Sequence, residues 1–341
     1  MTVPMSTGKA RSTRAVCRGS FENRFVKLVY VLLIFMLGGC GKGNSSFDET
    51  SREIEFARRR HAETLAAQTA NKMSLRRERG PVTFDATLEA GDQLQSSGET
   101  ARALWSYLKA LDLEPDAIEP RTRIGLLHLK DDPDRAAAVF SEVLERTPDS
   151  AAAHFGLGLA FVARGDQDEA FRELLRADEL LPNTAMILAA RGSLDEQMGK
   201  RESALILLRQ AHDLNPTDRD ILNNLGVTLL LDDQIDESTR LLERAALLYP
   251  DDTMLQNNLG LAYGLNENYE RSFRAFSKVG DERSARNNLG YVYFLNGRLD
   301  EALAEYETAL LAEGSDPMIV LRNIEAALAV QSKSGPASVA D

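Results

Sequence analysis

Apolar residues recur at helical spacing in two successive segments within residues 151–184. The segments AAAHFGLGLAFVARG and DQDEAFRELLRADELLPN each place apolar side chains three or four positions apart, as on one face of a helix. Gly165-Asp166 predicts a turn between them, with the aspartate placed to cap the second helix. Pro182 predicts the end of that helix. The stretch is therefore predicted to form a pair of helices.

The same two-helix pattern repeats from residue 84 onward. A glycine of the first helix recurs at steps of 33 or 34 residues, and of 30 at the last step: Gly91, Gly125, Gly158, Gly192, Gly226, Gly260 and Gly290. An alanine or valine of the second helix follows the same period: Ala110, Val143, Ala177, Ala211, Ala245, Val279 and Ala309. Prolines close most of the units: Pro115, Pro148, Pro182, Pro216 and Pro250. A shared period in three residue classes indicates a repeat protein.

This pattern resembles the tetratricopeptide repeat (TPR), which has small residues at fixed positions of both helices and a proline near the end. The units are 84–117, 118–150, 151–184, 185–218, 219–252, 253–282 and 283–316, and the sixth lacks four residues and its proline. The resemblance implies an all-α fold, a right-handed superhelical solenoid of about seven helix pairs. A helix from Met318 to Val330 is predicted to cap the last pair.

In the TPR family the first helices line a concave groove that binds other proteins. Units five to seven repeat the phrase Asn-Asn-Leu-Gly in this helix, and an asparagine amide can both donate to and accept from an extended peptide backbone. The candidate peptide-binding residues are Asn223, Asn224, Asn257, Asn258, Asn287, Asn288, Leu261, Tyr291 and Phe294. A second interpretation remains open, in which the asparagines bond only to a neighbouring helix. Peptide binding predicts that joint replacement of Asn224, Asn258 and Asn288 by alanine weakens partner capture without changing thermal stability.

The amino-terminal segment has the features of an export signal. Basic residues precede an apolar run, Leu28 to Leu37, and Gly38-Gly39-Cys40 follows. Ten helical residues extend about 15 Å, half of the hydrocarbon core, which disfavours a spanning helix. Leu37-Gly38-Gly39-Cys40 also resembles the lipobox of bacterial lipoproteins, which implies cleavage before Cys40 and acylation of its thiol.

These features predict four segments along the chain. Residues 1–39 are predicted to be a lipoprotein signal peptide, and residues 40–83 a lipidated amino terminus with a partly helical spacer. Residues 84–330 are predicted to be the TPR solenoid with its capping helix. Residues 331–341 are predicted to be a flexible tail.

Charge and composition narrow the function. The chain carries 40 Lys and Arg against 52 Asp and Glu, a net charge of −12, which argues against a general nucleic-acid binder. The four histidines lie far apart, three in different units and one before the repeats, without metal-ligand spacing, and no phosphate loop or nucleophile motif is present. We therefore predict no enzymatic activity, no metal and no cofactor.

The combination of lipobox, spacer and repeats resembles TadD-like proteins of the tight-adherence (Tad/Flp) pilus system. The resemblance implies an outer-membrane lipoprotein that faces the periplasm, is held in the bilayer by acylated Cys40, and helps to assemble a pilus or secretion machine. Its protein partners would be a secretin or pilus assembly subunits. Two alternatives remain: an envelope adaptor that tethers peptidoglycan (murein) hydrolases or synthases, and a scaffold for outer-membrane protein assembly.

Overall fold

The computed structural model describes residues 82–334 except residue 315. The predicted signal peptide, Cys40, nearly all of the 40–83 spacer and residues 335–341 of the predicted tail lie outside the described residues. Within them the chain forms fifteen α-helices and no strand, which confirms the all-α prediction for this part. The chain divides into two compact units, with the boundary between Val139 and Phe140 inside helix α6 (Pro133–Arg146).

The first unit contains the first two predicted helix pairs up to the middle of α6. Its helices are α3 (Phe84–Ser96), α4 (Thr100–Leu113), α5 (Glu119–His128) and the beginning of α6. Helix α3 packs on α4, and α4 packs on α5. The buried Tyr107 donates its hydroxyl hydrogen bond to Asp92 Oδ1 at 2.7 Å, and Arg123 Nε also donates to Asp92 at 2.8 Å. This network connects three helices of the unit.

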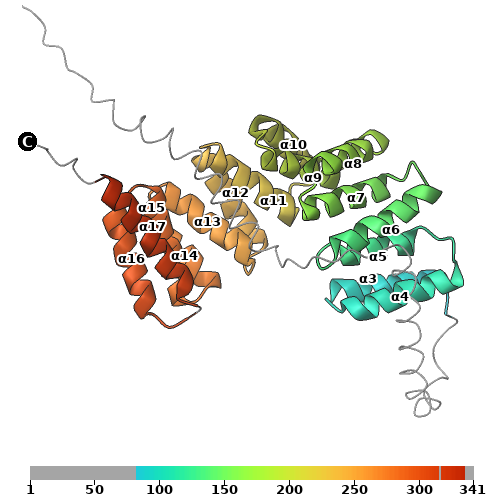
Figure 1. Ribbon diagram of the computed structural model, residues 1–341, viewed down its shortest axis with the longest axis horizontal. Helices are drawn as coiled ribbons and strands as arrows, with labels where there is room; N and C mark the ends of the chain where they lie inside the picture. Colours follow the sequence, from blue (N-terminus) through green and yellow to red (C-terminus); the bar gives the residue numbers. More distant parts are fainter. Residues whose placement is uncertain (1–81, 315, 335–341) are drawn as a thin grey trace, which may run out of the picture. The chain divides into compact units, whose positions relative to one another are not determined.

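The second unit contains, after α6, five helix pairs and a final helix. The helices are α7 (Ala151–Arg164), α8 (Gln167–Leu180), α9 (Ala185–Gln197), α10 (Arg201–Leu214), α11 (Arg219–Leu231), α12 (Ile235–Leu248), α13 (Thr253–Leu265), α14 (Tyr269–Val279), α15 (Glu282–Leu295), α16 (Leu299–Leu311) and α17 (Met318–Ser334). Each first helix packs on its own second helix, and each second helix packs on the first helix of the next pair (Figure 1). Helix α17 packs on α16 and covers the last pair, as predicted. It ends at Ser334 rather than Val330, so residues 331–334 belong to the helix and not to the tail.

The periodic glycines allow the two helices of a pair to approach closely. A Cβ atom on Gly158 would lie 2.7 Å from Leu174 Cγ, and one on Gly226 would lie 2.7 Å from Leu242 Cδ2. In every unit except the second, the glycine faces the side chain sixteen residues later, and these partners are buried: Tyr107, Leu174, Leu208, Leu242, Phe276 and Tyr306. The space at each of these glycines is therefore filled by one large apolar or aromatic side chain of the second helix.

The turn inside the third unit differs in one respect from its prediction. Gly165 ends α7 with φ +85°, a left-handed conformation that favours glycine. Asp166 occupies the amino-terminal cap of α8, but its side chain makes no capping hydrogen bond. Instead, its carboxylate forms an ion pair with Arg164 Nε at 2.8 Å. The predicted side-chain cap is thus wrong, because the neighbouring arginine binds the carboxylate.

Helix α14 reflects the four residues missing from the sixth unit. It has 11 residues, whereas α12 has 14 and α16 has 13. It ends at Val279, and Gly280 follows where the other units continue toward their proline. Helix α14 connects α13 to α15, so these two first helices are joined by a shorter second helix than the other first helices of the second compact unit.

Candidate functional site

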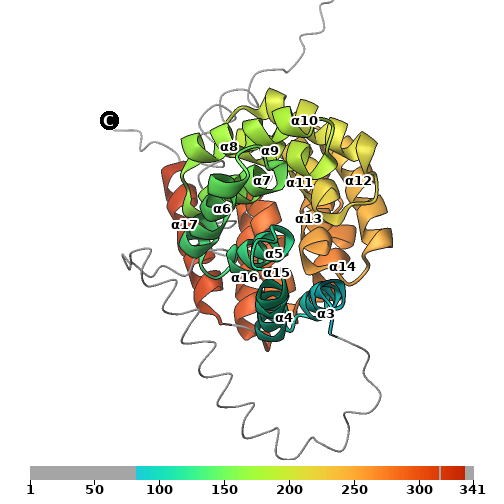
Figure 2. The same ribbon diagram turned by 90° about the vertical axis from the view of Figure 1, so that its right-hand side faces the viewer.

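The first helices of the second unit lie next to one another. Helix α9 contacts α11, α11 contacts α13, α13 contacts α15, and α15 contacts α17; Figure 2 shows α11 beside α13. The predicted residues are distributed over three of these helices: Asn223 and Asn224 on α11, Asn257, Asn258 and Leu261 on α13, and Asn287, Asn288, Tyr291 and Phe294 on α15. The prediction therefore selected residues of one continuous row of helices.

Asparagine amides form a hydrogen-bonded chain across α13, α11 and α9. Asn258 Nδ2 donates to Asn223 Oδ1 at 2.7 Å, and Asn223 Nδ2 donates to Asn224 Oδ1 at 3.2 Å. Asn224 Nδ2 then donates to Ser193 Oγ at 2.8 Å. Asn223 is buried and the other two asparagines are half-buried. Bonds to a neighbouring helix are what the second interpretation predicts, while peptide binding stays a prediction.

These bonds change one expectation from the sequence. Because Asn224 and Asn258 each bridge two helices, replacing them by alanine removes contacts that stabilise the fold. The joint alanine variant is therefore expected to lower thermal stability, and its weaker partner capture would not separate binding from folding.

The amide chain is interrupted between α13 and α15. On the far side, Asn323 Nδ2 of α17 donates to Asn287 Oδ1 at 2.8 Å, and Asn287 Nδ2 lies 3.5 Å from Asn288 Oδ1. Among the described residues, however, no hydrogen bond joins the asparagines of α13 to those of α15. This is the helix pair connected by the short α14. Asn257 and the Asn288 amide nitrogen are left without a hydrogen-bond partner in the described part of the chain.

Tyr291 of α15 also carries a polar group without a hydrogen-bond partner within the described chain. Its Oη atom is buried, and no described residue hydrogen-bonds to it. Burial raises the pKa of Tyr291 to about 12, so the phenol stays neutral at pH 7 and can donate one hydrogen bond. Its ring stacks on Phe294 with centroids 6.4 Å apart. Phe294 and Leu261 are half-buried and pack partly on the core.

Sequence reasoning missed Ser193 and Asn323. Neither belongs to an Asn-Asn-Leu-Gly phrase, and each is found only by its hydrogen bond to an asparagine 31 or 36 residues away. These separations are close to one repeat length, which is the signal that could have pointed to them. In the described part of the chain, no cluster of three or more His, Cys, Asp or Glu side chains could hold a metal ion. None of the helices between Phe84 and Ser334 combines the length and apolar character that crossing a bilayer requires.

Residues 130–183 and 266–317 match the family model of the tetratricopeptide repeat. These two ranges contain TPR repeats, and the described part of the chain has the TPR solenoid fold. Its helix pairs, glycine contacts and stacking of first helices are those expected of the TPR fold. TPR arrays in general serve as scaffolds for protein–protein interaction.

Solved structures of other proteins resemble this fold. The crystal structure of the APC/C hetero-tetramer Cut9-Hcn1 is similar with a TM-score of 0.57 and 20% identity over 70% of this chain, which spans about half (48%) of that chain. The thermophilic TPR protein TTC0263 from Thermus thermophilus has a TM-score of 0.49 and 24% identity, covering 53% of this chain and 98% of that one. Pseudomonas aeruginosa pilF has a TM-score of 0.48 and 18% identity, covering 63% and 96%. No curated protein sequence matches this chain.

Proposed function

We propose that this TPR scaffold binds an extended segment of a partner protein at the interruption between α13 and α15. The observation that carries the proposal is that Asn257 and the Asn288 amide nitrogen, on these two helices, have no hydrogen-bond partner among the described residues. The hydroxyl of Tyr291, on α15, also lacks one. Elsewhere along the row the amides are paired with one another. A peptide backbone offers an N–H and a C=O at each residue, which are the groups these side chains lack.

The spacing of helices suits an extended ligand. Packed helices lie about 8–10 Å apart, and an extended strand rises about 3.3 Å per residue, so a peptide running across α13 and α15 meets a new helix about every third residue. The half-buried apolar residues Leu261 and Phe294 follow these asparagines on α13 and α15 and would contact peptide side chains. Main-chain hydrogen bonds would then supply affinity, and the apolar contacts specificity.

We further propose that Cys40 is acylated and holds the scaffold on the periplasmic side of the outer membrane, where it helps to assemble a pilus or secretion machine. The support is the lipobox-like Leu37-Gly38-Gly39-Cys40 and the resemblance of the whole plan to TadD-like proteins. Two or more acyl chains suffice for stable anchoring, because each buried methylene contributes about 0.8 kcal/mol. Labelling cells with radioactive palmitate tests the anchor: label should enter the wild-type chain and not the Cys40→Ser variant, and equal labelling of both would refute it.

Site-specific crosslinking tests the binding site and the partner together. A photoreactive phenylalanine analogue at Phe294 should capture a discrete partner in intact cells, while the same analogue at Leu247, an exposed position on α12, should not. Mass spectrometry then names the captured protein. A secretin or pilus subunit supports the assembly role, whereas a murein hydrolase or synthase supports the adaptor alternative. Equal capture from both positions would refute the proposed site.

A further inference from the structure

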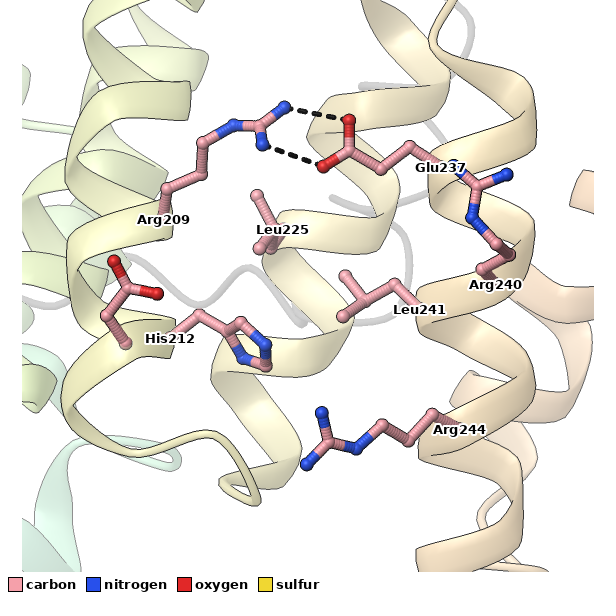
Figure 3. A pocket seen from close by; sticks show the side chains of 8 residues that line it. Arg209, His212, Leu225, Glu237, Arg240, Leu241 and Arg244 are labelled. Carbon is pink, nitrogen blue, oxygen red and sulfur yellow. Dashed lines mark hydrogen bonds and ion pairs between the residues drawn. The ribbon is translucent and has the colours of Figure 1, made fainter.

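A pocket of about 380 Å³ opens between α10, α11 and α12 (Figure 3). The lining residues are Arg209, His212, Asp213, Leu225, Glu237, Arg240, Leu241 and Arg244. All but Leu225 belong to α10 and α12, which are second helices of their pairs. The pocket is thus formed by other residues than the asparagine row and is independent of the proposed peptide site.

The pocket has an apolar floor and a charged rim. Leu225 is 4% exposed and belongs to the core cluster, and the half-buried Leu241 packs on the same cluster. At one end of the rim Arg209 donates two hydrogen bonds to Glu237, at 2.7 and 2.9 Å, so these two charges compensate each other. The remaining rim charges determine what the pocket can bind.

Three groups that line the pocket have no partner within the described part of the protein. Arg240 and Arg244 have no hydrogen-bond or ion-pair partner among the residues that the structure describes. His212 Nδ1 is buried and forms no hydrogen bond with any described residue. In Figure 3 the imidazole of His212 and the guanidinium of Arg244 extend into the same space between α10 and α12. A buried polar atom without a partner is rare in folded proteins, and an unpaired arginine near it, Arg244, favours an anion.

We propose that this pocket binds a carboxylate attached to a short aliphatic group. The carboxylate lies between His212 and Arg244, where it accepts a hydrogen bond from the buried imidazole nitrogen and pairs with the guanidinium. The aliphatic part lies on Leu225 and Leu241. A phosphate dianion is disfavoured, because Asp213 and Glu237 line the same pocket and the chain carries a net charge of −12.

Binding of this ligand is coupled to protonation of His212. Burial lowers the pKa of His212, the nearby Arg244 lowers it further, and Asp213 opposes them, so the free imidazole is neutral at pH 7. A bound carboxylate favours the imidazolium, and linkage then requires binding to tighten as the pH falls. The other charged groups that line the pocket are Asp213, Glu237, Arg209, Arg240 and Arg244.

A carboxylate on a short aliphatic group could belong to a free aliphatic acid or to a glutamate side chain of a polypeptide, so the test uses one ligand of each kind. Pentanoate and the blocked tripeptide acetyl-Ala-Glu-Ala-amide are titrated into the full-length chain, and the His212 imidazole resonance is followed by NMR, assigned with His212→Gln. At least one ligand should shift this resonance saturably, about threefold more tightly at pH 6 than at pH 7.5. The ligand that binds more tightly identifies the source.

Two variants and two further ligands make the test specific. Arg244→Gln should weaken binding about tenfold, whereas Arg274→Gln, at an exposed arginine of α14 that pairs with Glu270, should not change it. Pentanamide, the neutral isostere, should bind much more weakly than pentanoate. The proposal is overturned if neither carboxylate shifts His212 at concentrations up to about 50 mM, if phosphate binds more tightly than both, or if Arg244→Gln and Arg274→Gln behave alike.

Discussion

Replacing Asn258 by alanine tests whether the asparagine chain stabilises the stacked first helices. Asn258 Nδ2 donates to Asn223 Oδ1 at 2.7 Å, and Asn223 is 7% exposed, so the substitution leaves a buried acceptor without its donor. Leaving such a group unpaired costs about 1–3 kcal/mol. Asn288 occupies the same position of its own first helix, but its hydrogen bond within the described residues is a 3.5 Å contact from Asn287. A contact at this limit contributes less than about 0.5 kcal/mol.

The two alanine variants form a matched pair. Each replaces a half-buried asparagine at the same helical position, so the gain in helix propensity is the same in both and cancels in the comparison. Amide hydrogen exchange measured by mass spectrometry reports the local opening of each helix. In Asn258→Ala the amides of α11 and α13 should exchange about 5–30 times faster, as expected for a loss of 1–2 kcal/mol. Asn288→Ala should leave exchange in α13 and α15 close to that of the wild type. Equal effects of the two substitutions would refute the interruption of the asparagine hydrogen bonds between α13 and α15.

Three further predictions concern packing, the unsatisfied phenol and alkaline pH. Gly226→Ala brings a Cβ atom within 2.7 Å of Leu242 Cδ2, so a denaturant titration should show a loss of about 1–3 kcal/mol. Tyr291→Phe removes a buried hydroxyl that no described residue satisfies, so a thermal melt should show equal or higher stability while capture of the partner weakens. Burial raises the pKa of Tyr291 and, together with Glu243, that of Tyr263 to about 12, whereas unfolded tyrosine titrates near 10. In the folded state these two phenols therefore stay protonated to a higher pH than in the unfolded state. The denaturant midpoint should be constant below about pH 10 and fall between about pH 10 and 12. A midpoint that rises over this range would contradict the raised pKa values of the two tyrosines.

The helix pairs could be predicted from the sequence because one local cause repeats in nearly every unit. Gly158 and its counterparts are glycines since a large side chain sixteen residues later, such as Leu174, occupies the space of a Cβ atom. Both partners lie in one unit, so their spacing is constant and visible in the sequence. The prediction that the last helix ends at Val330 overlooked a signal in the sequence: Gly335-Pro336 directly follows Ser334, and no residue from Gln331 onward breaks the helix earlier.

The hydrogen bonds of the candidate site could not be predicted in the same way. Asparagine is compatible both with a bond to the next helix and with a bond to a ligand, and the choice depends on side-chain geometry between units. Asn258 and Asn288 have the same local sequence, yet one bridges two helices and the other does not. Asp166 is a second example, because its carboxylate forms an ion pair with Arg164 instead of the expected capping hydrogen bond.

The length of the sixth unit explains why two identical phrases differ in their contacts. Four missing residues correspond to about one helical turn, and α14 is shorter than α12 by nearly that amount. Across α11 and α13, which the full-length α12 connects, the amides of Asn223 and Asn258 pair. Across α13 and α15, which the short α14 connects, the amides of Asn257 and Asn288 are not paired in the described residues. A regular array of TPR units would have its polar groups occupied internally, so a change in repeat length is a physical means by which such a surface keeps donors and acceptors available for a partner.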